Sequence, residues 1–428
     1  MNDFSQRRDF LKFSGASAAL ATLGACATAE APPAKSVGRV VIIGGGWGGT
    51  TAAKYLRMWS GGAIQVFLIE REPNFVSCPM SNLVLAGSRK IEDLTIGYDK
   101  LRGYGVQVIR ANVTGINADR KRVQTDRIED LPYDRLIVSP GVDFLFDQVE
   151  GLNADAQKTI LHAWKAGPET VQLRRQLEAM PDGGTFVISI PRAPYRCPPG
   201  PYERVCQVAT YFKTAKPRAK IIVLDANEQI VSKPGLFRAA WDTYYKGMIE
   251  YRNNADVKRV DVRAMTVSTD FDTVKGDVLN VLPPMRAGTI AQQAGLITAN
   301  NRWCGIDWLT TESVARKDIH VLGDATLSAP AMPKSGHMAN QHGKIAAAAI
   351  TALMTGKEVN QNPVIANTCY SFTSDQHAIH VASVHRYNAD QKTLVPVAGS
   401  GGISAENNQI EHAYAQAWAG NMWSDMLA

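Results

Sequence analysis

The sequence predicts an α/β protein with two Rossmann-like domains and a smaller α+β C-terminal domain. A strand, a glycine-rich turn and an alanine-rich helix follow one another in GRVVIIGGGWGGTTAAKYLRMW, at 38–59. A second strand–loop–helix–strand unit occupies 184–226, and a third strand leads into a long alanine-rich helix within 318–350. Strands that alternate with helices in this way form parallel sheets covered by helices.

The segment SQRRDFLKFSGASAALATLGACATAEA carries a twin arginine, Arg7 and Arg8, ahead of a short apolar run. The run is too short to span a bilayer, so we expect residues 1–31 to be a twin-arginine export signal. The mature chain is then expected in the periplasm, without an integral membrane segment. Because Cys26 ends a lipobox-like LGAC, a lipid-anchored form is the alternative.

Charge and cysteine content narrow the function further. The 428 residues contain 46 Lys and Arg against 40 Asp and Glu, a mild excess without a basic block that would indicate nucleic-acid binding. Beyond the export signal, five cysteines remain for an oxidising compartment: Cys78, Cys197, Cys206, Cys304 and Cys369. Because five is odd, at least one has a role other than an intramolecular disulfide. No residue set suggests a metal site.

The first strand–helix unit has the features of a dinucleotide site. Gly44 permits the tight turn, Gly46 lets the backbone approach a pyrophosphate, and Gly49 allows the helix to pack on the strand. Phosphates would lie at the helix N-terminus. Glu70 ends the next strand, IQVFLIE, where a carboxylate would bind the adenosine ribose.

Two later strand ends indicate which dinucleotide is bound. One strand ends in Pro140-Gly141, and another ends in Gly323-Asp324, where the aspartate is placed to accept a hydrogen bond from a ribityl hydroxyl. This pairing resembles the two-dinucleotide-domain flavoproteins, which include the disulfide reductases, and the resemblance implies FAD. Lys334 precedes the long helix and would favour an anionic reduced flavin, or it is a solvated loop lysine.

The second unit lacks a glycine loop. In PYRCPPGPYERVC, at 194–206, four prolines and one glycine surround Cys197, and proline supplies no amide donor to a pyrophosphate. We therefore expect no nicotinamide site here, and we interpret Asp225 as an ordinary strand-end carboxylate. One interpretation is that the loop fixes the Cys197 sulfur near Glu203, which would act as a base. The alternative is that Cys197 is a small buried residue and Glu203 is a charge at the N-terminus of a helix.

The motifs PYRCPPGPYER, VSCPMSN (76–82), MPKSGHMANQHGK and NTCYSF (367–372) closely resemble the flavoprotein subunit of flavocytochrome c sulfide dehydrogenase. The resemblance implies that Cys197 and Cys369 form a redox-active disulfide and that Glu203 is the catalytic base. It also implies that Cys78 is joined to the flavin 8α-methyl group. Cys206 and Cys304 form a structural disulfide or are two buried thiols.

The implied reaction is oxidation of sulfide to sulfur or polysulfide through the disulfide and FAD. The chain has no C-x-x-C-H motif, so the haem would belong to a separate c-type cytochrome subunit. A sulfide:quinone oxidoreductase is the first alternative, although the last 18 residues contain no Lys or Arg for docking on an anionic membrane. A flavoprotein that repairs thiols of sulfur-oxidation proteins is the second alternative.

The same segments predict the domain organisation. The FAD-binding domain takes 38–150 and 283–360, and the second Rossmann-like domain is inserted at 151–282. Residues 361–428 form the C-terminal domain, which carries Cys369 and would cover the flavin.

Overall fold

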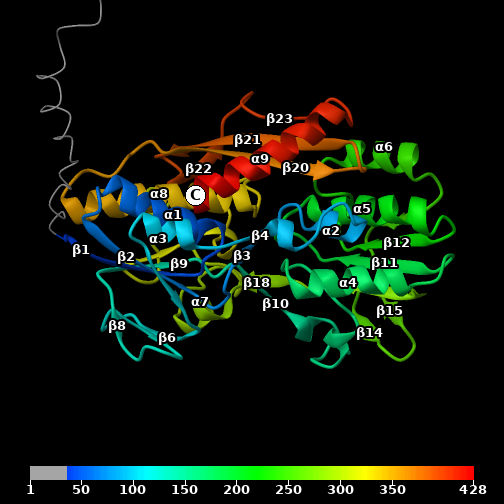
Figure 1. The fold of residues 1–428 in the computed structure, drawn as a ribbon, viewed down its shortest axis with the longest axis horizontal. Coiled ribbons are helices and arrows are strands. Elements are labelled where there is room, and N and C mark those ends of the chain that lie inside the picture. Colours follow the sequence, from blue (N-terminus) through cyan, green and yellow to red (C-terminus); the bar gives the residue numbers. More distant parts are fainter. Residues whose placement is uncertain (1–35) are drawn as a thin grey trace, which may run out of the picture. The chain divides into compact units, whose positions relative to one another are not determined.

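A parallel five-stranded sheet supports the first glycine loop (Figure 1). The protein is described by a computed structural model that covers residues 36–428, and the strand order in this sheet is β19-β9-β1-β2-β5. Its strands are β1 (Gly38–Ile43), β2 (Ile64–Glu70), β5 (Gln107–Arg110), β9 (Arg135–Val138) and β19 (Ile319–Val321). The apolar central strands fit a sheet that is buried on both faces.

Two helices pack together against this sheet. Helix α1 (Trp47–Trp59) begins directly after the glycine loop and packs along α8 (Gly336–Thr355). Their buried alanines include Ala52 and Ala53 on α1 and Ala346 and Ala347 on α8. Small side chains let the two helices approach closely, which holds the starts of both helices near the same edge of the sheet.

The central part of the chain forms a second parallel sheet, in the order β13-β12-β11-β17. Its strands are β11 (Thr185–Ile190), β12 (Lys220–Asp225), β13 (Ile249–Arg252) and β17 (Val278–Val281), and its helices are α4 (Pro168–Ala179), α5 (Gly200–Ala215) and α6 (Pro234–Tyr244). The proline-rich segment connects β11 to α5, so it occupies the position of a dinucleotide-binding turn.

The C-terminal part is an antiparallel sheet covered by a helix. Its elements are β20 (Val364–Phe372), β21 (Ala378–Asn388), β22 (Thr393–Pro396), β23 (Gly402–Ile403) and α9 (Gln409–Leu427). Figure 1 shows the long β20–β21 hairpin running along the top of the view, from the side of α8 to the side of α6. Strand β20 packs on both α8 and α5, so it contacts a helix from each of the two Rossmann-like units.

Smaller elements complete the fold. Two three-stranded sheets are β6-β7-β8 (Val113–Asn117, Arg122–Thr125, Leu131–Pro132) and β14-β15-β16 (Arg259–Asp261, Thr266–Ser268, Thr273–Lys275). Two strand pairs are β3 (Phe75–Val76) with β4 (Thr95–Ile96) and β10 (Val142–Phe144) with β18 (Met285–Ala287). Short helices are α2 (Asn82–Ala86), α3 (Asp99–Gly103), α7 (Thr289–Gln293), η1 (Glu92–Leu94), η2 (Phe146–Gln148), η3 (Ala156–Lys158) and η4 (Gly323–Ala325).

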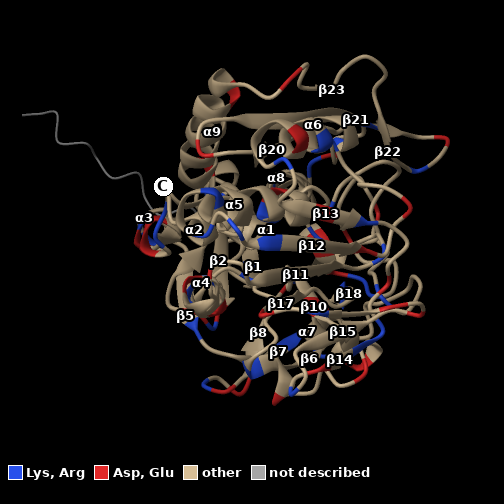
Figure 2. Ribbon diagram, turned by 90° about the vertical axis from the view of Figure 1, so that its right-hand side faces the viewer, with Lys and Arg blue, Asp and Glu red and all other residues tan. Residues whose placement is uncertain are grey.

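The predicted fold class is confirmed, while the domain boundaries stay a prediction. The expected export signal at 1–31, with Cys26, lies outside the described residues. Within 36–428, no helix has both the length and the apolar character needed to cross a bilayer. Figure 2 shows acidic and basic residues interspersed along the loops on the side that faces the viewer.

Candidate active site and cofactor cavity

One cavity of about 1020 Å³ brings most of the predicted site residues together. It lies where the first glycine loop, the start of α8, strand β20 and the proline-rich segment meet. The predicted residues that line it are Gly44, Gly46, Glu70, Cys78, Pro140, Gly141, Cys197, Glu203, Gly323, Asp324 and Cys369. Gly49 and Lys334 are not among the lining residues.

The glycine loop has the geometry of a phosphate cradle. Gly44 has φ +100°, and a Cβ there would lie 2.3 Å from the Ser139 carbonyl oxygen. A Cβ on Gly49 would lie 1.9 Å from the Gly44 carbonyl oxygen, so this glycine lets α1 pack against β1. A Cβ on Gly46 would meet no atom within 4 Å, and this open space adjoins the N-terminus of α1.

Glu70 is held by the loops beside it. Its Oε2 accepts a hydrogen bond from the Gly45 amide at 2.6 Å, and its Oε1 accepts one from the Glu72 amide at 2.9 Å. Each carboxylate oxygen has a further lone pair for a ribose hydroxyl. The geometry therefore fits the ribose-binding role expected at the end of β2.

Four residues that line the cavity have a buried polar atom without a partner within residues 36–428: Asp324 (Oδ1), Trp47 (Nε1), Arg196 (Nη2) and Trp418 (Nε1). Burial also raises the pKa of Asp324. An orphaned buried oxygen and an orphaned buried N–H are costly unless a ligand pairs with them. A ribityl hydroxyl would satisfy Asp324, and a phosphate or flavin acceptor atom would satisfy Trp47, so these residues fit FAD.

Lys334 is a buried residue of the loop that precedes α8, so it is not a solvated loop lysine. Its ammonium donates hydrogen bonds to the carbonyl oxygens of Asp324 (3.0 Å) and Thr326 (2.5 Å) and lies over the Trp303 ring, 3.7 Å from the centroid. It is not among the residues that line the cavity, and its predicted effect on the flavin stays a prediction. Its carbonyl, however, accepts the Cys197 amide at 2.8 Å. The next residues, Ser335 and Gly336, do line the cavity at the start of α8.

Cys197 has a fixed and strained backbone. Its φ is +59°, which lies in the left-handed region that non-glycine residues rarely adopt. The Cys197 amide donates a hydrogen bond to the Lys334 carbonyl, and the Cys197 carbonyl accepts one from the Gly200 amide at 2.9 Å. The carbonyl of the preceding residue, Arg196, accepts a hydrogen bond from the Trp164 indole N–H at 3.1 Å. Burial, then the neighbouring Cys369 and Glu203, raise the pKa of the Cys197 thiol.

Glu203 lies in the first turn of α5 and is 9% exposed. Its Oε2 accepts a hydrogen bond from the Asn82 amide group at 2.8 Å, and its Oε1 accepts one from the Phe372 backbone amide at 2.9 Å. Burial raises the pKa of Glu203, while these two donors lower it. A carboxyl group with a raised pKa is suited to proton transfer near neutral pH.

Cys369 lies on β20 and shares the cavity with Cys197. Its sulfur accepts a hydrogen bond from the Asn367 amide group at 3.4 Å, and Asn367 in turn accepts one from Ser335 at 2.8 Å. Burial raises the pKa of the Cys369 thiol, while Asn367, then Lys233, lower it. All five cysteines of the described chain are thiols, so a Cys197–Cys369 disulfide stays a prediction.

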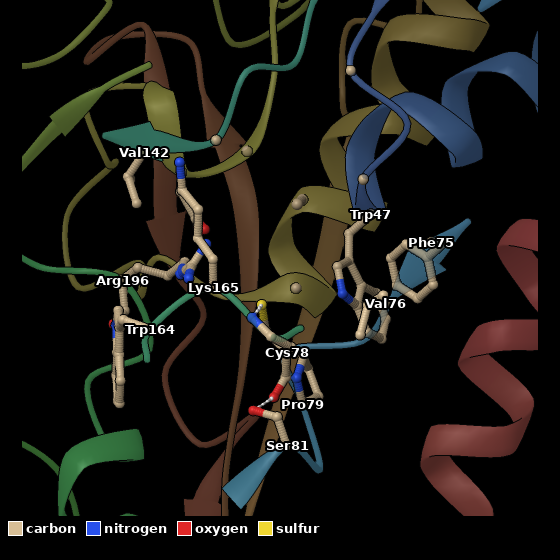
Figure 3. Close-up of a pocket in the computed structure, with 18 of the residues that line it drawn as sticks. Trp47, Phe75, Val76, Cys78, Pro79, Ser81, Val142, Trp164, Lys165 and Arg196 are labelled. Carbon is tan, nitrogen blue, oxygen red and sulfur yellow. Dashed lines mark hydrogen bonds between the residues drawn. The ribbon is translucent and has the colours of Figure 1, made fainter. Parts of the chain in front are cut away.

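Cys78 points into the space between two walls of the cavity (Figure 3). Trp47, Phe75 and Val76 lie on one side of it, and Trp164, Lys165 and Arg196 lie on the other. Its sulfur accepts a long hydrogen bond from the Ala166 amide at 3.5 Å, and its carbonyl accepts one from the Ser81 hydroxyl at 2.7 Å. No other hydrogen bond from a described residue reaches this sulfur, so it is available to a ligand in the cavity.

The expected ribose-binding position of the second unit is occupied by the protein itself. Asp225 is fully buried, and its Oδ2 accepts hydrogen bonds from the hydroxyls of Tyr202 (2.7 Å) and Tyr251 (2.9 Å). Its Oδ1 accepts from the backbone and side chain of Asn227. These contacts agree with the interpretation of Asp225 as a structural carboxylate. That this domain takes no nicotinamide nucleotide stays a prediction.

The two unassigned cysteines are buried thiols in different parts of the core. The Cys206 sulfur accepts the Trp241 indole N–H at 3.3 Å among the residues of the central domain. Cys304 belongs to a separate hydrophobic cluster that also includes Trp308. Cys206 and Cys304 are therefore two buried thiols in this structure and do not form a disulfide with each other.

Sequence reasoning missed several residues of this site. Asn82 links Glu203 to Arg204, because its Oδ1 accepts the Arg204 Nε–H at 3.1 Å. Asn82 belongs to the cysteine motif VSCPMSN, which was a usable signal. Lys233, whose ammonium donates to the Cys369 carbonyl at 3.1 Å, has no local signal beyond the proline that follows it. Within 36–428, no group of three or more His, Cys, Asp or Glu residues is placed to hold a metal ion.

Comparisons with known proteins agree with this geometry. Residues 38–172 match the pyridine nucleotide-disulphide oxidoreductase family, and residues 6–24 match the twin-arginine translocation pathway signal sequence, which indicates export. The structure of sulfide:quinone oxidoreductase from Aquifex aeolicus is similar, with a TM-score of 0.74 and 19% identity over 91% of each chain. The fold and the cavity thus define a flavoprotein of the pyridine nucleotide-disulphide oxidoreductase class.

More specific matches identify the family. Residues 170–283 match the central region of the sulfide dehydrogenase (flavocytochrome c) flavoprotein chain, and 361–427 match the flavin-binding region of flavocytochrome c sulphide dehydrogenase. The flavoprotein chain from Chlorobaculum thiosulfatiphilum is 52% identical over 46 residues, which are 11% of this chain and 94% of that sequence. The chain therefore belongs to the flavocytochrome c sulfide dehydrogenase flavoprotein family, and its flavin-binding region indicates FAD.

A further relative is more distant. The mitochondrial sulfide:quinone oxidoreductase of Mus musculus is 24% identical over 328 residues, which are 71% of this chain and 68% of that protein. This chain thus spans about two thirds of the length of that relative.

Proposed function

We propose that this protein is a periplasmic, FAD-dependent sulfide dehydrogenase that passes electrons to a c-type cytochrome subunit. The observation that carries the proposal is the convergence of Cys197, Cys369 and Glu203 on one cavity whose other wall fits FAD. The family membership supports sulfide as the substrate and a cytochrome as the partner. The match of residues 6–24 to an export signal supports the periplasm.

The proposed chemistry begins with a Cys197–Cys369 disulfide. Hydrosulfide bonds to one cysteine sulfur and the S–S bond breaks, which leaves a persulfide on one cysteine and a thiolate on the other. Glu203 takes up the proton when hydrogen sulfide is the incoming species. A second hydrosulfide bonds to the outer sulfur of the persulfide, releases HSS⁻ and leaves a thiol.

Re-forming the disulfide from this thiol and thiolate releases one proton and two electrons. A bound FAD would supply the acceptor for this electron pair and the means of passing electrons singly to a haem. The balance is two HS⁻ converted to HSS⁻, H⁺ and two electrons. Gly44, Gly46, Glu70 and Asp324 would hold the dinucleotide, and we propose that Cys78 is its covalent attachment.

Anaerobic addition of sulfide to the purified holoprotein tests this function. The flavin absorbance should bleach, and the electrons should then reduce added cytochrome c but not a water-soluble quinone analogue. Reduction of the quinone analogue alone would favour a sulfide:quinone oxidoreductase. A flavin that sulfide does not bleach would contradict both activities.

A further inference from the structure

We infer that Lys233 is a positioning residue that stabilises the Cys369 thiolate and so directs hydrosulfide to Cys197. The inference rests on the proposed sulfide dehydrogenase function, and it specifies which sulfur of that site reacts.

Lys233 reaches the site from the central domain. It is the N-cap residue of α6, and its φ of +54° lies in the left-handed region. Its side chain is 3% exposed, and its ammonium donates hydrogen bonds to the Cys369 carbonyl at 3.1 Å and to the Ser371 hydroxyl at 2.9 Å. Both acceptors are neutral groups of β20. The lysine therefore fastens the strand that carries Cys369 without a carboxylate partner.

A buried ammonium on neutral acceptors is unfavourable unless negative charge develops nearby. The left-handed backbone adds a further cost. Burial lowers the pKa of Lys233 to about 8, and four groups act in the opposite direction: Cys369, Glu203, Cys197 and Glu411. Three of these four line the proposed reaction cavity. The cation is thus placed where a reduced disulfide would leave a thiolate.

The surroundings of the two sulfurs are asymmetric. The groups that face Cys369 are Asn367, Lys233, Ser335 and Asp324, and the first three favour its thiolate. The groups that face Cys197 are Cys369, Glu203, Arg196 and Asp324, and only Arg196 favours its thiolate. Negative charge is therefore easier to place on Cys369 than on Cys197.

This asymmetry sets the direction in which a disulfide opens. The sulfur with the lower thiol pKa leaves faster in thiol–disulfide exchange. Hydrosulfide then forms its new S–S bond with Cys197, the Cys197–Cys369 bond breaks, and the electron pair of that bond stays on Cys369. The products of the step are a Cys197 persulfide and a Cys369 thiolate, with no proton or further electron required.

Alkylation of the reduced protein tests the role of Lys233 directly. Wild type, Lys233→Gln, Lys233→Arg and the control Lys54→Gln are treated with iodoacetamide across a pH series, and peptide mass spectrometry gives the midpoint for each cysteine. Lys54 is a second buried lysine, but its ammonium binds the Ser424 carbonyl on α9. The Cys369 midpoint should rise by about one pH unit in Lys233→Gln. It should stay near wild type in Lys233→Arg and Lys54→Gln.

Trapping of the persulfide needs no variant. The oxidised wild-type protein receives less than one equivalent of sulfide, is quenched with alkylating agent, and is digested for mass spectrometry. The extra sulfur should be on Cys197. Extra sulfur on Cys369, or an unchanged Cys369 midpoint in Lys233→Gln, would overturn the inference. If sulfide fails to bleach the flavin, the proposed function fails, while the alkylation midpoints, measured without sulfide, still decide the role of Lys233.

Discussion

Glu203 connects the three chain segments that carry the site cysteines. It lies on the helix after Cys197, and its two oxygens are held by Asn82, which follows Cys78, and by Phe372, which follows Cys369. The same carboxyl group that is placed to accept a proton therefore also fixes the spacing of the sulfurs.

Glu203→Gln should slow flavin reduction by sulfide by about 10²–10⁴-fold, the usual contribution of a positioned base. Because burial raises the pKa of Glu203 and the carboxylate is the form that accepts a proton, the wild-type rate should rise as pH increases through that pKa. Rapid-mixing experiments over a range of pH measure this increase in the rate of flavin reduction. The increase should be absent from the Glu203→Gln variant because an amide does not titrate there. Identical pH profiles for the two proteins would contradict the role of base.

Cys78 is predicted to hold FAD covalently. Acid-precipitated wild-type protein should stay yellow, whereas Cys78→Ser should release its flavin into the supernatant because the serine cannot form the thioether. Cys206→Ala is the matched control, since it removes a thiol from the core of the central domain. Flavin released from the wild type would show that the attachment is absent.

The sequence predicted the cysteines of the site better than the residues that hold those cysteines in position. Cys78, Cys197 and Cys369 lie in short motifs that are recognisable locally, and all three line the cavity. The bond from Lys233 to Cys369 joins residues 136 positions apart, and such long-range pairing leaves no local pattern. Lys334 was expected to favour an anionic reduced flavin, which stays a prediction, and its hydrogen bonds to the Asp324 and Thr326 carbonyls were not predicted from the sequence.

At the level of the elements, the turn from β1 to α1 contains one glycine that is needed for packing and another that borders the cofactor cavity. Gly49 gives α1 its close contact with the turn, whereas Gly46 borders open space in the cavity. Local sequence was sufficient for this unit, because strand, turn and helix are contiguous. The position of β20 against both α8 and α5 depends on long-range contacts that no local pattern specifies.

Two alanine substitutions distinguish these roles. Gly49→Ala places a Cβ 1.9 Å from the Gly44 carbonyl oxygen and should lower the free energy of unfolding by about 1–3 kcal/mol or more. Gly46→Ala meets no protein atom within 4 Å, so it should leave the thermal stability of the apoprotein unchanged while lowering FAD content. Calorimetry and flavin absorbance measure both. Equal FAD content in Gly46→Ala and wild type would mean that the pyrophosphate lies elsewhere.

At the scale of the whole molecule, two similar sheets have different roles. The first keeps an open glycine loop, whereas the second has a proline-rich loop and an Asp225 whose oxygens are occupied by Tyr202, Tyr251 and Asn227. The loop that would bind a nicotinamide dinucleotide instead positions Cys197 at the flavin cavity. Electrons would then enter through sulfur.

NADH and NADPH should accordingly leave the flavin oxidised. The measurement is flavin absorbance under anaerobic conditions, with dithionite added afterwards to show that the flavin is reducible. Fast bleaching by either nucleotide would show that the protein does accept electrons from a nicotinamide nucleotide.

We propose that sulfide reduces the flavin through Cys197 and Cys369. The most direct measurement is anaerobic rapid mixing of sulfide with wild type and with Cys369→Ser, each checked for equal FAD content, in the presence of cytochrome c. We expect the flavin to bleach and cytochrome c to be reduced in the wild type, while Cys369→Ser keeps an oxidised flavin. Bleaching of Cys369→Ser at the wild-type rate, or no bleaching of the wild type, would contradict it.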